Sequence, residues 1–421
     1  MSSQPGLARR LSTADAVHIG VGSMVGAGLF TAFGPAAAAA GTLLLVALGL
    51  AAVVAFCNAT SSAQLAAQYP TSGGTYVYGR ERLGAWWGFV AGWGFVIGKT
   101  ASCAAMAMTF AAYLVPEGWQ RPVAVAAVVG LATVNYHGVT RTAGLTRALV
   151  TAVLALLAVT LVVVAATGGA PSSTVSGQGA PVGWAGVTQG AALLFFAFAG
   201  YARIATMGEE VQHPRRTIPR AIVIAFAIVV PLYAVTGWLL LERLGATDLA
   251  GQQAPLRVVA ESTPYAVWLG PVVVVAAVVA ALGALLSLIA GVGRTALAMA
   301  RAGDLPAPLA RVHERHAVPH VAEVALAVVV SLLVLVADLR EVIGFSSFGV
   351  LTYYAVANAA AFTQTGGHRR YPRTLQVVGL AGCVLLAVTV PTESLVPGLA
   401  VLAVGVAGRV IVLRRRATSA T

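Results

Sequence analysis

Long apolar stretches separated by short polar connections run through almost the whole chain, and they limit its fold more than any other feature. Two examples are 42-TLLLVALGLAAVVAFC-57 and 148-ALVTAVLALLAVTLVVVAA-166. A helix that crosses the hydrocarbon core of a bilayer needs about 20 mostly apolar residues. Only 10% of the residues are charged, whereas a soluble domain has about 25%. We therefore expect an all-α integral membrane protein in a lipid bilayer.

Twelve stretches are long and apolar enough to be expected as transmembrane helices. They are residues 15–39, 42–67, 85–114, 121–137, 143–167, 185–208, 218–241, 265–300, 320–337, 341–364, 373–391 and 394–413. The glycine-, serine- and proline-rich segment 168-GGAPSSTVSGQGAP-181 is expected to be an external loop, and no stretch has the composition of a second, soluble domain.

The positions of the arginines predict the orientation. Cytoplasmic loops of membrane proteins carry an excess of Lys and Arg. With the N-terminus inside, most of the 26 basic residues fall in cytoplasmic loops or at cytoplasmic helix ends, and the exceptions are four on the outside and two within spans: Arg121, Arg243, Arg257, Arg340, Lys99 and Arg203. We expect a multi-pass protein of the cell membrane with both termini in the cytoplasm. The N-terminal stretch MSSQPGLARRLSTADAV has no apolar region before its arginines and no small-residue cleavage site, so we expect a cytosolic lead-in and not a signal peptide.

The first expected span contains the glycine-rich run 20-GVGSMVGAG-28. Glycine costs about 1 kcal/mol relative to alanine inside a helix, so four glycines in this run disfavour a continuous helix. A close-packing face of small residues at Gly22 and Gly26 is the alternative. A dinucleotide-binding loop is excluded because no strand precedes the glycines.

The sixth expected span has a similar interruption near its middle, in 195-FFAFAGYARIATMGEE-210. Paired glycine-interrupted helices at corresponding positions of two halves indicate the substrate site of a secondary transporter. Unwound helix ends offer backbone N–H groups to a carboxylate and backbone carbonyls to an ammonium. Such a site would recognise the head group of an amino acid without using a charged side chain.

Three runs in this order resemble the amino acid–polyamine–organocation transporter superfamily. They are DAVHIGVGSMVGAGLF from residue 15, FFAFAGYARIATMGEEVQHPRRTIPRAI from residue 195, and RTALAMARAGDLPAPLARVHERHAVPHVAEVAL from residue 294. The resemblance implies the leucine-transporter-type fold, with two inverted repeats of five helices and two peripheral helices, and transport by alternating access. The implied segments are a cytoplasmic lead-in (1–14), the first repeat (15–167), an external loop (168–184), the second repeat (185–364), the peripheral helices (365–413) and a cytoplasmic tail (414–421).

The resemblance also implies which residues bind substrate. The amides that bind the carboxylate correspond to Ala27 and Gly28, next to Gly26, and the carbonyls that bind the amine correspond to Met24, Phe196 and Ala199, next to Gly200. Phe196 and Phe198 occupy the place of a bulky gate over the substrate.

Lys99 is the only lysine in the chain, and it lies near the middle of the third expected span. An unpaired charge at this depth costs at least about 2.5 kcal/mol. In the superfamily the third helix lines the substrate cavity, whereas the lysine that several proton-coupled members carry on the fifth helix is replaced here by a residue near Val153. We interpret Lys99 as a coupling or substrate-sensing group, with a structural ion pair as the alternative.

Four further polar residues are candidates for a gate or an ion pair. Arg203 lies seven residues before Glu210 and so shares a helix face with it, and Asp15 and His18 share a face of the first half-helix. Many members of the superfamily have an acid at the position of Ala202, and this chain does not. A cationic substrate would therefore meet Lys99 and Arg203 with no acid nearby, so we expect the substrate to be a neutral or acidic amino acid.

Other classes of function find little support in the sequence. Cys57, Cys103 and Cys383 lie in apolar stretches, and His313, His316 and His320 lie in an arginine-rich loop, so we expect neither metal nor cofactor. No catalytic signature or nucleic-acid-binding patch is present, so an enzyme is not expected. The prediction is an amino acid permease, proton-coupled, with an exchanger or a channel-like facilitator as alternatives. The particular amino acid and the oligomeric state are left open.

Overall fold

The computed structural model describes residues 11–70, 73–138, 143–167, 183–207, 210–316 and 318–418. Within these ranges the chain is helical and contains no strand, apart from one isolated bridge between Leu11 and Val211. Most of the expected external loop, the first ten residues and the last three lie outside the described residues.

The long helices follow the apolar stretches of the sequence. The α-helices are α1 (Thr13–Met24), α2 (Ala27–Thr31), α3 (Phe33–Ala40), α4 (Leu44–Gln68), α5 (Gly74–Leu83), α6 (Ala85–Leu114), α7 (Gln120–Tyr136), α8 (Ala143–Ala166), α9 (Trp184–Phe198), α10 (Ala202–Ala205), α11 (Pro214–Ala250), α12 (Pro255–Glu261), α13 (Ala266–Arg301), α14 (His320–Val336), α15 (Leu339–Phe362), α16 (Arg373–Thr389) and α17 (Thr392–Thr418). Eight helical segments of the described chain are long and apolar enough to cross a membrane. The sequence did not predict α5, a short helix between the second and third expected spans, because its residues are polar and contain two arginines.

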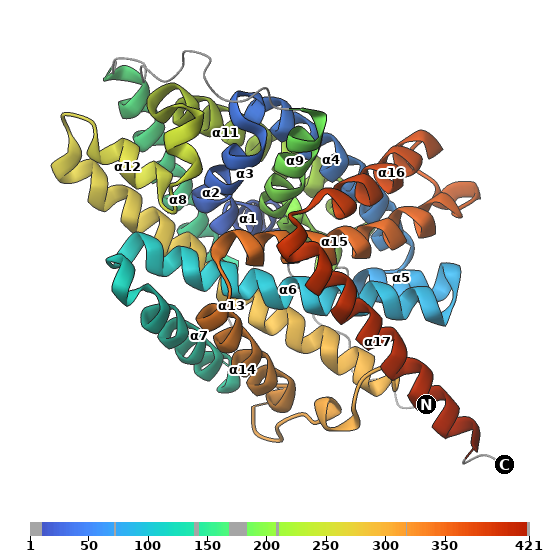
Figure 1. Ribbon diagram of the computed structural model, residues 1–421. Coiled ribbons are helices and arrows are strands. Elements are labelled where there is room, and N and C mark those ends of the chain that lie inside the picture. The colour runs from blue at the N-terminus through green and yellow to red at the C-terminus, as the bar shows by residue number, and fades with distance from the viewer. Residues whose placement is uncertain are drawn as a thin grey trace.

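Helix α6, which carries Lys99, runs through the middle of the bundle (Figure 1). It packs against α13 and α15, with α7 and α14 on one side and the N-terminal helices on the other. In the most apolar 18-residue stretch of α6, 89% is buried inside the protein, whereas in the corresponding stretch of α17 only 11% is buried. Helix α6 is therefore a core element, and α17 lies at the periphery.

The first expected span is broken where the glycine-rich run predicts a break. Helix α1 ends at Met24, and α2 begins at Ala27 after Gly26, whose φ of −79° and ψ of −140° are not helical. The interruption in the sixth span is milder: α9 ends at Phe198 and continues as a 3-10 turn, Ala199–Tyr201, before α10. The two interruptions differ in extent, although the sequence predicts both.

The two interrupted segments cross in direct backbone contact. A Cβ atom on Gly200 would lie 2.2 Å from the Ser23 carbonyl oxygen, and one on Gly28 would lie 2.3 Å from the Ala197 Cα. No side chain fits at this separation, so glycine is required on each side of the crossing. The crossing fixes the first and sixth spans against each other at their interruptions.

A buried polar network holds α15 against the rest of the bundle. The Asn358 amide donates to Asn58 Oδ1 on α4 at 2.6 Å, and the Ser61 hydroxyl donates to Asn358 Oδ1 at 2.7 Å. Buried polar groups of this kind are stable only when they are hydrogen-bonded. The network positions Tyr354, one turn before Asn358, next to the interruption in the sixth span.

A second network lies at one end of the bundle, around the Asp304 carboxylate in the connection after α13. Arg409 of α17 forms an ion pair with Asp304 Oδ1, with 2.9 Å between nitrogen and oxygen. Arg80 of α5 donates to Asp304 Oδ2 at 3.1 Å. The Asp304 and Arg409 side chains are each only 6% exposed, and the Arg409 guanidinium lies 4.7 Å from the centre of the Phe89 ring. The peripheral helix α17 is therefore attached through a buried ion pair.

Replacing Arg409 with methionine should destabilise the protein strongly. The variant leaves the buried Asp304 carboxylate with the partly exposed Arg80 in place of two cationic partners, and removing one partner of a buried pair costs about 3–5 kcal/mol. Arg121→Met is the matched control, because Arg121 pairs with Asp338 at 3.9 Å with both side chains exposed, and such pairs contribute up to about 1 kcal/mol. Thermal unfolding in detergent should give a much lower midpoint for the first variant, and equal shifts for both would contradict the buried attachment.

Candidate functional site

A cavity opens beside the crossing of the two interrupted spans. Its walls come from α1, α6, α9, α10 and α13, and its lining residues include Ser23, Phe95, Lys99, Ser102, Met106, Phe196, Ala199, Gly200, Arg203, Glu210, Ser287 and Arg294. Six of the predicted site residues line it: Lys99, Phe196, Ala199, Gly200, Arg203 and Glu210. Residues from distant parts of the chain thus converge on the glycine interruptions.

Lys99 is 5% exposed, and its ammonium faces the interruption in the sixth span. The ammonium donates a hydrogen bond to the Ala199 carbonyl at 3.1 Å. None of the ion pairs found among the described residues includes Lys99. The geometry therefore favours a polar role at the helix interruption over a structural ion pair.

The backbone groups predicted to bind an amino acid head group lie close to the cavity wall. The Ala27 N–H donates to the Met106 sulfur at 3.1 Å, and a Cβ on Gly26 would lie 3.2 Å from the same sulfur. The Met24 carbonyl accepts a hydrogen bond from the Tyr233 hydroxyl at 2.6 Å. Gly28 faces Ala197 at the crossing rather than the cavity.

The remaining predicted groups on the sixth span are divided between the cavity and the core. Phe196 lines the cavity, but its carbonyl accepts the Ala199 N–H and so stays within the helical hydrogen-bond pattern. Phe198 is fully buried on another face, where its ring stacks on Phe226 at 6.1 Å between centroids. Of the two phenylalanines predicted as a gate, only Phe196 is therefore in contact with the cavity.

Tyr233 of α11 joins the two interrupted spans and was not predicted from the sequence. Its buried hydroxyl contacts the Met24 carbonyl at 2.6 Å and the Ala197 carbonyl at 3.0 Å. The hydroxyl has a single hydrogen, so the two carbonyls share one donor. A lone tyrosine in an apolar span offers no sequence pattern that would identify this role.

Charged side chains gather at one end of the cavity. Arg203 and Glu210 lie 4.0 Å apart, and Arg294 of α13 lines the same end. The backbone N–H of Leu11 donates to the Glu210 carbonyl at 3.0 Å, so the N-terminal segment lies at this end. With Lys99, the lining contains three cationic side chains and one acidic side chain.

On the side of the interruptions away from Leu11, aromatic and polar contacts close the space between α2 and α6. Phe30 and Tyr113 pack edge to face with centroids 5.5 Å apart, and both rings are fully buried. The Tyr113 hydroxyl donates to the Phe30 carbonyl at 2.8 Å, and Thr31 bonds Thr109 at 3.1 Å. The cavity therefore extends from the interruptions toward the end that carries Leu11.

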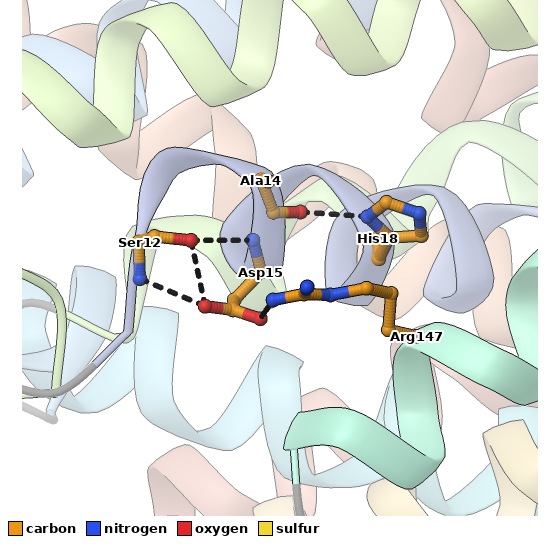
Figure 2. Close-up of polar contacts among 5 residues, drawn as sticks. All are labelled: Ser12, Ala14, Asp15, His18 and Arg147. Carbon is orange, nitrogen blue, oxygen red and sulfur yellow. Dashed lines mark hydrogen bonds and ion pairs between the residues drawn. The ribbon is translucent and has the colours of Figure 1, made fainter.

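Asp15 and His18 lie outside the cavity, on α1 near Leu11. Figure 2 shows that Asp15 caps the helix together with Ser12 and forms an ion pair with Arg147 of α8, while His18 bonds the Ala14 carbonyl of its own helix. The two residues share a helix face but do not bond to each other. Asp15 thus connects the first and fifth expected spans and is not a partner of Lys99.

Glu323 is another buried polar residue that sequence reasoning missed. It lies in the first turn of α14 with 3% exposure, and its Oε2 atom has no hydrogen-bond partner in the described part of the chain. Its Cγ atom lies 3.1 Å from the position of a Cβ on Gly293, next to Arg294. The signal available in the sequence was an acid within the apolar stretch 320–337.

The histidines after α13 form a ring cluster around Tyr136. The His313 and His316 rings are 4.7 Å apart between centroids. Loss of water contact and the neighbouring His313, His137 and Arg315 lower the pKa of His316. No group of three or more potential ligands in the described part of the chain is arranged to hold a metal ion.

Sequence comparisons identify proteins that are similar to this chain. The sequence model of the amino acid permease family matches residues 11–410. A protein described as an uncharacterized transporter of Mycobacterium tuberculosis is 55% identical over 98% of this chain and 94% of its own length.

Two relatives with named substrates are more distant. The branched-chain amino acid permease BcaP of Bacillus subtilis is 26% identical over 95% of this chain and 88% of its own length. Human cationic amino acid transporter 4 is 30% identical over 83% of this chain and 58% of its own length. The family match includes the helices that form the cavity, and the spans are apolar, as a protein that crosses a bilayer requires. The chain therefore belongs to the amino acid permease family of membrane transporters.

Proposed function

We propose that this protein is a secondary active transporter that moves a neutral or acidic amino acid across the cell membrane by alternating access, coupled to protons. The observation that carries the proposal is the cavity at the crossing of the two interrupted spans, where Gly200 meets the Ser23 backbone. Backbone groups at such interruptions recognise zwitterionic head groups.

The proposed architecture has twelve transmembrane segments. The first of the eight longer spans, Phe33–Gln68, is then assigned to α4 alone, because α3 belongs to the broken segment from Thr13 to Ala40. This broken segment and the helices α7, α14 and α16, of 17 residues each, would bring the eight spans to twelve. In this proposal residues 15–167 and 185–364 are inverted repeats, and residues 365–413 are peripheral. The low burial of α17 supports a peripheral place for the last helix.

In the proposed orientation both termini are cytoplasmic, and the cavity of this conformation faces the cytoplasm. The arginine distribution supports the orientation, and the cavity extends toward the end where Leu11 bonds Glu210. Closure by Phe30 and Tyr113 on the other side supports an inward-facing state. Alternating access would open this contact and close the charged end, with Arg203, Glu210, Asp15 and Arg147 as candidate inner-gate residues.

The charge of the cavity supports a substrate without net positive charge. The cavity is lined by three cationic side chains, Lys99, Arg203 and Arg294, and by one acidic side chain, Glu210. A cationic substrate would be repelled by the three cations, because like charges at close range repel in a medium of low dielectric constant. The names of the relatives point in two directions, branched-chain for the bacterial permease and cationic for the human transporter. The cationic lining favours the first kind of substrate over the second.

Within the proposed site, the Ala27 amide faces the substrate carboxylate, the Met24 and Ala199 carbonyls face its ammonium, and Phe196 covers its side chain. Lys99 is the proposed coupling or substrate-sensing group. Its support is burial at the cavity wall and a hydrogen bond to a helix interruption. A lysine in such surroundings can change protonation during a cycle.

Uptake into proteoliposomes tests the function. Radiolabelled L-leucine, L-glutamate and L-arginine are offered with an inward proton gradient and without one. At least one of the first two should accumulate against its gradient, and arginine should be about tenfold or more weaker, corresponding to about 1.4 kcal/mol of charge repulsion.

Three other outcomes would contradict parts of the proposal. Preferred accumulation of arginine would contradict the substrate class. Flux that only equilibrates would favour a facilitator, and flux that requires amino acid on the opposite side would favour an exchanger. Protein-free vesicles and the Arg121→Met variant are the controls.

A further inference from the structure

Two side chains of α6 bond to the two helix interruptions at the same time. Lys99 and Met106 are seven residues apart, which is two helical turns, so both face the same side of α6. The Lys99 ammonium donates to the Ala199 carbonyl at 3.1 Å, and the Met106 sulfur accepts from the Ala27 N–H at 3.1 Å. Both side chains line the cavity.

The chemistry of these contacts parallels that of an amino acid head group. A lysine ammonium has three N–H donors and a positive charge, as a substrate α-ammonium does. The carbonyl that it contacts lies in the 3-10 turn of the sixth span, where the regular helical pattern changes. The sulfur is only a weak acceptor, whereas a carboxylate oxygen would bond the same N–H more strongly.

Among the described residues, no ion pair holds Lys99 away from this carbonyl. Asp15 pairs with Arg147, and Glu210 pairs with Arg203. Among the described side chains, the Tyr354 hydroxyl also lies within reach of the Ala199 carbonyl, at 3.5 Å. In this conformation the lysine is therefore the closer of these two side-chain donors to that carbonyl.

We infer that Lys99 is a tethered competitor of the substrate: in the empty transporter its ammonium occupies the Ala199 carbonyl, and the amino group of the substrate displaces it. The inference rests on the proposed function, because it requires an amino acid to bind at the interruptions. It assigns Lys99 to the amine end of the substrate, with Met106 on the Ala27 N–H at the carboxylate end.

Two consequences follow. In the empty site, the Lys99 ammonium is hydrogen-bonded to the Ala199 carbonyl. The substrate must break this contact before it binds, which reduces its apparent affinity. The same contact keeps the Ala199 carbonyl paired in the empty site, so the empty transporter can change conformation and return without a substrate. Lys99 thus lowers affinity and permits net uptake instead of obligatory exchange.

Replacing Lys99 with methionine should therefore strengthen binding while slowing net uptake. The dissociation constant of the better of L-leucine and L-glutamate, measured by isothermal titration on purified protein, should fall about tenfold, the factor expected for a hydrogen bond from a charged group. Initial net uptake should fall by a similar factor, but exchange between preloaded vesicles and medium should persist. Lys99→Gln, which keeps a neutral donor, should be intermediate.

Thr100→Val is the matched control, because Thr100 lies next to Lys99 on α6 but bonds only its own helix, at the Val96 carbonyl. It should bind and transport like the unsubstituted protein. Added n-propylammonium should compete with substrate in Lys99→Ala, because it restores an ammonium at the vacated carbonyl.

The other roles of Lys99 predict different results. If Lys99 held the substrate carboxylate, Lys99→Met and Lys99→Gln would both bind more weakly, and if it only carried a proton, affinity would not change. Either result overturns the inference and leaves amino acid transport intact. Failure of the unsubstituted protein to bind or transport any amino acid overturns the proposed function instead. Monodisperse elution and helical circular dichroism establish that each variant is folded.

Discussion

Gly200→Ala should reduce amino acid uptake by about 10- to 100-fold while the protein still inserts into the membrane. The added methyl group would lie 2.2 Å from the Ser23 carbonyl oxygen and 2.5 Å from the Met24 nitrogen. These are backbone atoms of α1, so a side-chain rotation cannot relieve the clash. Overpacking of this kind costs about 1–3 kcal/mol, and each 1.4 kcal/mol corresponds to a factor of ten.

The reciprocal variant and a matched control make this prediction specific. Gly28→Ala places its methyl group 2.3 Å from the Ala197 Cα, on the other side of the same crossing, and should have a similar effect. Gly49→Ala, in α4, has open space around its Cβ and should leave uptake unchanged. Uptake by Gly200→Ala at the level of Gly49→Ala would contradict a rigid crossing at the binding site. Surface expression is measured for all three.

Tyr233→Phe should have the second largest effect. The substitution keeps the ring and removes only the hydroxyl that bonds the Met24 carbonyl at 2.6 Å and the Ala197 carbonyl at 3.0 Å. The buried Met24 and Ala197 carbonyls would then lose the hydroxyl that they share as a donor. An unsatisfied buried group costs about 1–3 kcal/mol. Uptake should fall about tenfold or more, and the thermal midpoint should fall with it.

Tyr265→Phe is the control for the loss of a phenolic hydroxyl, because Tyr265 is 49% exposed at the start of α13. Its uptake and its thermal midpoint should match those of the unsubstituted protein. If Tyr233→Phe behaves in the same way, the hydroxyl bridge does not hold the two interrupted spans together.

The sequence predicts the helical fold and the place of the break in the first span because both depend on local properties. A long apolar run favours a helix in a bilayer, and four glycines near Met24 disfavour helix continuity regardless of what packs around them. The milder 3-10 turn at Ala199–Tyr201 could not be distinguished from a full break, because its extent depends on contacts with Tyr354 and Lys99.

The roles that the sequence could not predict depend on pairings between distant segments. Tyr233, Met106 and Glu323 are single residues in apolar surroundings, and only their positions against other helices give them partners. Phe196 and Phe198 show the same limit: they are two positions apart in the chain, yet one faces the cavity and the other packs on Phe226. A helix face becomes meaningful only when its neighbours are known.

Lys99 illustrates how a sequence anomaly can identify a site without defining its chemistry. A single lysine near the middle of an apolar span indicates a function, because its burial is costly. Whether it binds an acid, a substrate or a carbonyl depends on what the other helices place beside it. The nearest group proved to be the Ala199 carbonyl, on a helix a hundred residues away.

The central claim, that an amino acid head group binds at the helix interruptions, can be tested by substrate protection of a cysteine in the cavity wall. Ser287 lines the cavity from α13, and the native cysteines are buried, so a Ser287→Cys variant should react alone with an anionic methanethiosulfonate reagent. The transported amino acid should slow labelling. Its decarboxylated amine and its deaminated acid should not, because each lacks one end of the head group. Equal protection by all three compounds, or none by an amino acid that is transported, would contradict the claim.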